Sequence, residues 1–455
     1  MVGKIKKDQI FRAYVMFIIL LGGFLLVFLF NNVTSHFESG TWLYRDAEII
    51  PTFPPAGNDF RVGYYNPAYY LIESHFKAIG PNGTYPSNYP PLVALSGLPY
   101  VLFSSTTAYA IHLVILILAN LANLLMAVLM VKHILLEKLG LDDFAINVIT
   151  VVLFFLAAFY VFSSYFFLYS LERGNTDSLV MLYCLLAMWV LIKRPDNIWL
   201  QVILLSVAVH FKIYPIVLFP ILLFKHGKKI ILPALLVNLV FLFCLGPRMA
   251  WEFFKGVTAG GQGAGIGNFW ASESNHAAYS FSIGMDKVSG DTLSGTFFVI
   301  WGITFFVPLL IWAITTLAIV LKKYSNFNAV ILFMVSVPLM NLLPTYSIDY
   351  RLILYGVVII LFFGLILKQF VQKFTWFDLI QVVLLIGVLV MLSRSPVFID
   401  KDLPFIRNKY IWILLLEIFM SINIIRNQRK CYQPEAELMD PNMAGSAEPI
   451  TMPGK

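Results

Sequence analysis

Charged residues are scarce in this chain of 455 residues. Asp, Glu, Lys and Arg together make up 13% of it, whereas 59% of the residues are hydrophobic. A water-soluble protein needs about twice that share of charge to cover its surface. Apolar runs of about 20 residues alternate with short polar breaks, as is typical of helices that cross a membrane. We therefore expect an all-α polytopic membrane protein.

The sequence also lacks several motifs that carry well-known chemistry. It contains no ATPase phosphate-binding loop, no dinucleotide fingerprint, no GxSxG elbow and no His/Cys cluster with metal-ligand spacing. These absences argue against ATP-driven transport and zinc-peptidase chemistry, and we expect neither a metal nor another cofactor. The three cysteines, Cys184, Cys244 and Cys431, do not form a disulfide framework.

The net charge of +7 does not indicate a nucleic-acid partner, because of where the positive residues lie. Lys and Arg are concentrated in short clusters between apolar runs, for example at residues 131–138, 224–229 and 426–430. The positive-inside rule places such clusters in the cytoplasm. We therefore expect a multi-pass protein, of the bacterial plasma membrane, with both termini cytoplasmic.

About twelve transmembrane helices fit this distribution of charge. The expected spans are residues 11–30, 107–131, 144–162, 176–193, 198–210, 213–224, 229–246, 297–321, 327–343, 351–368, 376–393 and 405–425. They form one domain of residues 1–430, and residues 431–455 are expected to be a disordered cytoplasmic tail.

Two long loops then fall on the outer side, at residues 31–106 and 248–296. The first loop contains apolar residues at helical spacing, which predict a helix along the membrane surface. Its apolar segment at residues 90–103 contains three prolines and is short, so we interpret it as re-entrant or interfacial.

Ionisable residues at membrane depth are informative, because each costs about 2.5–3.5 kcal/mol on insertion scales. The expected topology gathers such residues on the outer side: Asp46, Asp59, Arg61, Glu172, Arg173, Asp177, His210, Lys212, His276, Asp349 and Arg351. Cations can hold a lipid phosphate, aromatic rings can pack on a sugar, and a carboxylate can deprotonate an acceptor hydroxyl. This mixture suits transfer of a sugar from a lipid-phosphate donor.

Five segments occur in the order seen in one known family. They are NDFRVGYYNPAYYL (58–71), YPSNYPPLVALSGLPYVLF (85–103), SLERGNTDSLVMLYCLLA (170–187), VAVHFKIYPIVLFPILLFK (207–225) and LPTYSIDYRLILYG (343–356). In this order the chain resembles glycosyltransferase family 87. The resemblance implies the GT-C fold and a polyprenyl-phosphate-linked sugar as donor, as in mycobacterial mannosyltransferases, with a glycolipid or glycan as acceptor.

The resemblance also implies roles for individual residues. An acidic residue of the first outer loop is the catalytic base; the match is Asp59, and Asp46 is the competing candidate. Residues 175–177 can cap a helix that starts there. The remaining expectations are donor-phosphate binding by Arg173, Lys212 and Arg351, and substrate binding by Arg61, Tyr64, Tyr65, His276 and Tyr350. His276 can instead cap a helix. The last motif departs from the family, because Tyr350 and Arg351 stand where a histidine is expected.

Two other functions remain open at this point. A transporter or flippase of lipid-linked saccharides also explains many helices with intramembrane charges, but it predicts inverted halves with broken helices at the midplane. We find no such symmetry in the sequence. A non-catalytic scaffold for envelope assembly would not require the charged residues of different segments to meet.

Overall fold

The computed structural model describes residues 57–77, 89–136, 143–259, 295–322, 324–344, 349–372, 375–393 and 408–430, together with residues 15, 22, 23, 25, 277, 278, 281, 282 and 347. Every regular element in these ranges is a helix. The tail at 431–455 and most of the expected span 11–30 and of the two long loops lie outside the described residues.

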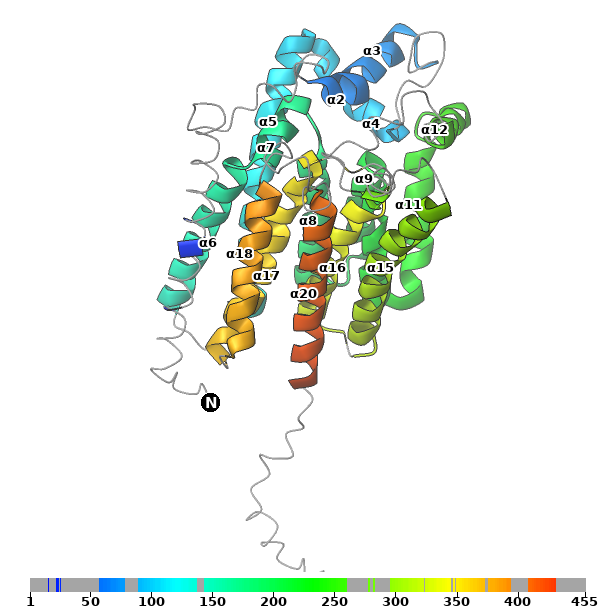
Figure 1. Cartoon of the computed structure of the whole chain (residues 1–455). Helices are drawn as coiled ribbons and strands as arrows, with labels where there is room; N and C mark the ends of the chain where they lie inside the picture. Colours follow the sequence, from blue (N-terminus) through cyan, green and yellow to red (C-terminus); the bar gives the residue numbers. More distant parts are fainter. Residues whose placement is uncertain are drawn as a thin grey trace, which may run out of the picture.

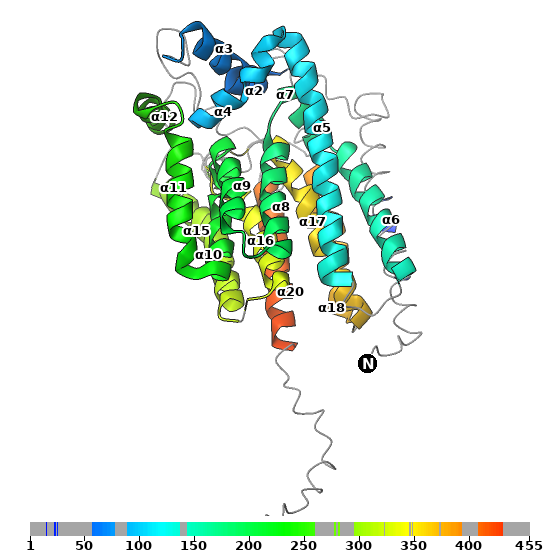
Figure 2. The same ribbon diagram turned by 180° about the vertical axis from the view of Figure 1, so that it is seen from behind.

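The longer helices run side by side as a bundle (Figures 1 and 2). They are α5 (Ser105–Met130), α6 (Asp143–Phe162), α8 (Asp177–Lys193), α9 (Ile198–Phe211), α11 (Ile231–Leu242), α15 (Gly295–Val320), α16 (Asn326–Leu342), α17 (Tyr355–Gln372), α18 (Trp376–Ser393) and α20 (Lys409–Lys430).

Shorter helices lie across one end of this bundle. Figure 1 shows α2 (Asn58–Phe60), α3 (Asn66–Glu73), α4 (Pro91–Ser96) and α12 (Pro247–Ala259) at the upper end. Buried Met249 of α12 packs with Leu71 and Ala94, so the surface helices contact one another. The remaining short elements are η1 (Arg61–Tyr65), η3 (Leu98–Leu102), η4 (Val131–Leu136), α7 (Tyr165–Arg173), η6 (Tyr214–Leu218), α10 (Phe219–His226), η7 (Gly227–Ile230) and η8 (Asp349–Leu354).

The described residues include five helices that are long and apolar enough to span a membrane, or up to seven if each of two bent pairs is one span. The five are Ser105–Ile134, Asp143–Phe162, Phe298–Val320, Arg351–Val371 and Trp376–Ser393. The expected number of twelve is therefore not confirmed. The expected spans at 198–210 and 327–343 form helices of 14 and 17 residues, which are shorter than the roughly 20 residues of a typical span.

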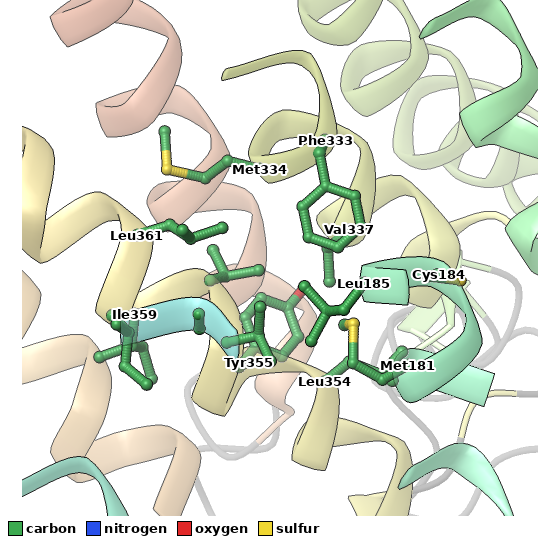
Figure 3. Close-up of a cluster of buried hydrophobic side chains, with 14 of the residues drawn as sticks. Met181, Cys184, Leu185, Phe333, Met334, Val337, Leu354, Tyr355, Ile359 and Leu361 are labelled. Atoms are coloured by element: carbon green, nitrogen blue, oxygen red, sulfur yellow. The ribbon is translucent and has the colours of Figure 1, made fainter. Parts of the chain in front are cut away.

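The centre of the bundle is formed by α8, α16 and α17. Figure 3 shows Met181 and Leu185 of α8 packed with Phe333 of α16 and Tyr355 of α17. In the span Arg351–Val371, which comprises the end of η8 and most of α17, 89% of the residues of an 18-residue apolar window are buried. In the span Phe298–Val320 of α15 the corresponding share is only 22%, so most of its side chains face outward. The α17 side chains are thus enclosed by protein, and Arg351 lies at the start of the buried span.

Candidate active site

A sharp bend between α7 and α8 places several polar residues at one point. The two helices meet at an angle of 106° across residues 174–176. Gly174 has φ +65°, and its N–H donates to the carbonyl of Leu171, a left-handed end of α7 that favours glycine. A Cβ atom on Gly174 would lie 2.7 Å from the Cβ of Phe60, so the absence of a side chain lets α2 approach.

The segment that carries Asp59 docks on this bend through its backbone. The N–H of Gly57 donates to the carbonyl of Glu172 at 2.7 Å, which satisfies an otherwise unpaired carbonyl at the end of α7. The hydroxyl of Tyr109 donates to the same carbonyl at 3.0 Å. Further along, the Tyr64 hydroxyl donates to Oγ1 of Thr176 at 2.7 Å. The first surface helices are therefore tied to the α7–α8 bend at two places.

Asp59 is buried, with 9% of its surface exposed, and both carboxylate oxygens have partners. Arg173 donates from Nη2 to Oδ1 at 2.5 Å, and Asn175 donates from Nδ2 to Oδ2 at 2.9 Å. Asn175 Oδ1 in turn accepts the backbone N–H of Asp177, at the start of α8. The carboxylate is thereby fixed by the two residues that flank Gly174, and Asn175 rather than Asp177 provides the side-chain hydrogen bond at the helix start.

A second carboxylate, Asp177, lies on the other side of the bend and is fully buried. Its Oδ1 accepts the hydroxyl of Tyr214 at 2.6 Å and lies 3.6 Å from the ammonium of Lys212. Lys212 follows the end of α9, and Tyr214 begins η6. The ammonium also lies 5.1 Å from the ring centre of Tyr89, a cation–π distance.

Arg351 completes the cluster from η8, the short helix that leads into α17. Its guanidinium lies 4.7 Å from the ring centre of Tyr214, and the residue is 5% exposed. Its Nε and Nη1 atoms have no hydrogen-bond partner among the described residues. Buried guanidinium groups are normally paired, so these donors are available to an anion.

The pKa of Lys212 is affected by the other charged groups of this region. Burial lowers the pKa of Lys212, the Asp177 carboxylate raises it, the Arg351 charge lowers it and the Asp59 carboxylate raises it. Both carboxylates and Arg351 are therefore close enough to Lys212 to act on one ammonium. Burial also raises the pKa of Tyr89.

We define the charge cluster as Asp59, Arg173, Asp177, Lys212 and Arg351. Three cations face two carboxylates, which leaves one net positive charge when all five are ionised. Among the described residues no three His, Cys, Asp or Glu side chains are close enough to hold a metal ion. The net positive charge of the cluster favours binding of an anion by its arginine and lysine groups.

The other expected site residues are placed differently. Tyr64 is buried, and its hydroxyl donates to Thr176, the residue before Asp177 of the charge cluster. The Tyr65 hydroxyl donates instead to the carbonyl of Phe103. Arg61 is partly buried near Tyr109, and its Nε is without a partner among the described residues. Asp46, His276 and the side chain of Tyr350 lie outside the described residues.

Sequence reasoning did not single out three residues of this region. Tyr89 and Tyr214 contact the cluster as aromatic rings, and the sequence offers no signal that separates them from other tyrosines. His112 is fully buried, with Nε2 3.2 Å from the Gly174 carbonyl and Nδ1 3.0 Å from the Tyr100 hydroxyl. A histidine inside an apolar run is itself a signal, and that signal was available.

Arg173, Asp177 and Lys212 of the charge cluster lie within the part of the chain that matches a known family, whereas Asp59 and Arg351 lie outside it. The sequence model of Glycosyltransferase family 87 matches residues 88–344, more than half of the chain. The chain therefore belongs to glycosyltransferase family 87. It is a membrane glycosyltransferase, and the resemblance noted in the sequence is confirmed. No curated protein and no solved structure matches the chain.

Proposed function

We propose that this protein is an inverting glycosyltransferase that uses a polyprenyl-phosphate-linked sugar, mannose or a similar hexose, as donor. The observation that supports this most strongly is the meeting of Asp59, Arg173, Lys212 and Arg351 in one buried cluster. These residues come from four separate parts of the chain. The acceptor in this proposal is a glycolipid or glycan at the membrane surface.

Asp59 acts as the general base in the proposed reaction. Each of its oxygens accepts one hydrogen bond, so each keeps a lone pair for the acceptor hydroxyl. The acceptor oxygen attacks the anomeric carbon from the face opposite the phosphate while Asp59 takes the hydroxyl proton. The bond between the anomeric carbon and the phosphate oxygen breaks, and its electron pair leaves with the lipid phosphate. The new linkage has the inverted configuration.

The cations of the cluster neutralise the phosphate. A sugar attached to a lipid phosphate is a phosphodiester with one negative charge, which matches the one net positive charge of the cluster. The departing lipid phosphate gains a further charge, so fixed guanidinium and ammonium groups stabilise the transition state more than the ground state. Arg351 and Lys212 fill this role in our proposal; Arg173 contributes while it also orients Asp59.

The proposed orientation places the cluster on the outer face of a bacterial plasma membrane. Asp59 of the cluster lies on α2, which covers one end of the bundle together with α3 and α4 (Figure 1). The C-terminal ends of α5, α8, α15 and α20 lie at the opposite end of the bundle (Figures 1 and 2). Lys193 and Arg426 are near the ends of α8 and α20, and Lys132 and Lys322 come just after α5 and α15. The positive-inside rule assigns that end to the cytoplasm.

Mass spectrometry of lipid-linked sugars in a strain that lacks the protein tests this proposal. We expect a polyprenyl-phosphate sugar to accumulate and one glycan or glycolipid to lack a sugar. Re-expression of the wild-type protein restores both, and re-expression of the Asp59→Asn variant restores neither. Accumulation of a complete saccharide on the inner leaflet would instead indicate a flippase and contradict the proposal.

A further inference from the structure

Asp177 has an unused hydrogen-bonding atom that the proposed reaction does not explain. The residue is fully buried, and its Oδ1 is engaged by Tyr214 and Lys212. Its Oδ2 has no hydrogen-bond partner among the described residues. Leaving a buried carboxylate oxygen unpaired is costly, and such atoms in native structures are uncommon. A ligand that donates a hydrogen bond to Oδ2 would remove this cost.

Arg351, which contacts the same Tyr214 as Asp177 does, has hydrogen-bond donors without acceptors among the described residues. The guanidinium of Arg351 packs on the ring of Tyr214, while the hydroxyl of that ring donates to Asp177. Nε and Nη1 of Arg351 lack acceptors, as Oδ2 of Asp177 lacks a donor. No ion pair between Arg351 and Asp177 is present among those of the described residues. The site thus offers donors to an anion and, beside them, a buried acceptor.

A sugar phosphate carries both complementary groups close together. Its phosphate oxygens accept hydrogen bonds, and its ring hydroxyls donate them within a few bonds of the phosphorus. Carboxylate groups are strong acceptors for such hydroxyls, because the acceptor is charged. Asp59 is less suited to this task, because Arg173 and Asn175 already contact both of its oxygens.

We propose that Oδ2 of Asp177 accepts a hydrogen bond from one ring hydroxyl of the donor sugar while Arg351 contacts the adjoining phosphate. This inference rests on the proposed function and adds a sugar-recognition residue to it. Asp177 then helps to select which sugar is transferred, because a sugar without a hydroxyl at that position leaves Oδ2 unpaired.

The rigidity of the carboxylate supports this assignment. The backbone N–H of Asp177 donates to Asn175, and the residue begins α8, where the helix dipole favours a negative charge. Tyr214 and Lys212 hold its other oxygen. A group fixed from three sides can discriminate between hydroxyl positions, since it cannot follow a displaced partner.

The test uses the full-length protein in lipid nanodiscs with polyprenyl-phosphate mannose and its monodeoxy analogues, one for each ring hydroxyl. If mannose is not transferred, the same set is built on the hexose that is. Transfer of the complete donor by the wild-type protein tests the proposed function separately. The inference concerns only the pattern of kcat/KM across the deoxy analogues, so the two can fail independently.

We expect one deoxy position to lower kcat/KM of the wild-type protein by about 10- to 100-fold, the effect of one hydrogen bond to a charged acceptor. In Asp177→Asn, removal of that hydroxyl should cost less than about threefold, while penalties at other positions stay as in the wild type. Asp378→Asn removes a similarly buried carboxylate that bonds Thr375 at the start of α18, and it should keep the wild-type pattern.

Two results would overturn the inference. One is a wild-type protein that loses less than threefold at every deoxy position, which can be measured even if the variant does not fold. The other is an Asp177→Asn variant that loses activity equally with every donor. That pattern assigns Asp177 to holding Lys212 and Tyr214 alone.

Discussion

Two of the polar clusters between the helices differ in charge. The charge cluster has five ionisable groups and leaves Asp177 Oδ2 and two nitrogens of Arg351 without partners among the described residues. The amide cluster, which we define as Gln369, Gln381 and Asn423, joins α17, α18 and α20 with neutral groups. Gln369 and Asn423 exchange two hydrogen bonds, and Asn423 also donates to Gln381.

The difference in charge indicates that the amide cluster stabilises the fold and that the charge cluster binds a ligand. Amide groups carry both a donor and an acceptor, so they can satisfy one another without a ligand. In the amide cluster Nε2 of Gln381 is the exception. Ionised groups that remain unpaired in a protein interior are costly, and a protein keeps them where a ligand completes them. The comparison predicts that changes in the charge cluster reduce activity and changes in the amide cluster reduce stability.

The largest effect is expected for Asp59→Asn. The amide cannot take a proton from the acceptor, so kcat should fall by about 100- to 10,000-fold, the usual contribution of a general base. Initial rates of purified protein measure this, and Asp378→Asn is the control for loss of a buried carboxylate. Normal turnover of folded Asp59→Asn would show that another group is the base.

A smaller loss is expected when Arg351 is replaced by Gln. Loss of a charge-assisted hydrogen bond of about 1.5–3 kcal/mol should lower kcat/KM for the donor by about 10- to 100-fold and leave KM for the acceptor unchanged. Arg194→Gln, at an exposed arginine after the end of α8, is the control for removal of a guanidinium. An equal loss for both substrates would indicate a folding defect.

The pH dependence offers a third comparison, centred on Lys212. The protonated ammonium holds the phosphate, and burial lowers the pKa of Lys212. Donor affinity should therefore decline as pH rises, at a lower pH than an ordinary lysine would give. Lys212→Arg stays charged throughout, so its pH profile should remain flat where that of the wild type falls. If donor affinity of the wild type and of Lys212→Arg declined at the same alkaline pH, the ammonium would have no role in holding the phosphate.

The smallest effect is expected in the amide cluster. Asn423→Leu should lower the free energy of unfolding by about 0.6–1.7 kcal/mol, the range for hydrogen bonds between membrane helices, with kcat unchanged. Thermal melting of the nanodisc-embedded protein measures this. The double variant with Gln369→Leu should lose less than the two single variants together, because both remove the same pair. Additive losses would show that the amides act separately.

The sequence singled out most residues of the charge cluster, but it did not predict which of them pair with one another. Asp59, Lys212 and Arg351 stood out because ionisable residues are rare in apolar chains. The pairing of Arg173 with Asp59 was not predicted, because it depends on the 106° angle between α7 and α8. Gly174 and the capping residues after it indicate a helix break, but local propensity does not set the angle. The expected number of twelve spans is not confirmed among the described residues, for a related reason. Hydropathy identifies apolar helices, but α16 is enclosed by protein and only 17 residues long.

The turn at Gly174 has a consequence for how this protein can evolve. Arg173 and Asn175, on either side of it, hold the residue proposed to accept the proton, and Asp177, two residues after Asn175, is proposed to recognise the sugar. One backbone turn thus positions both the proposed general base and the proposed sugar-binding carboxylate. A substitution that shifts this turn alters reactivity and substrate choice together, so new sugar preferences should arise more readily through the aromatic side chains around it.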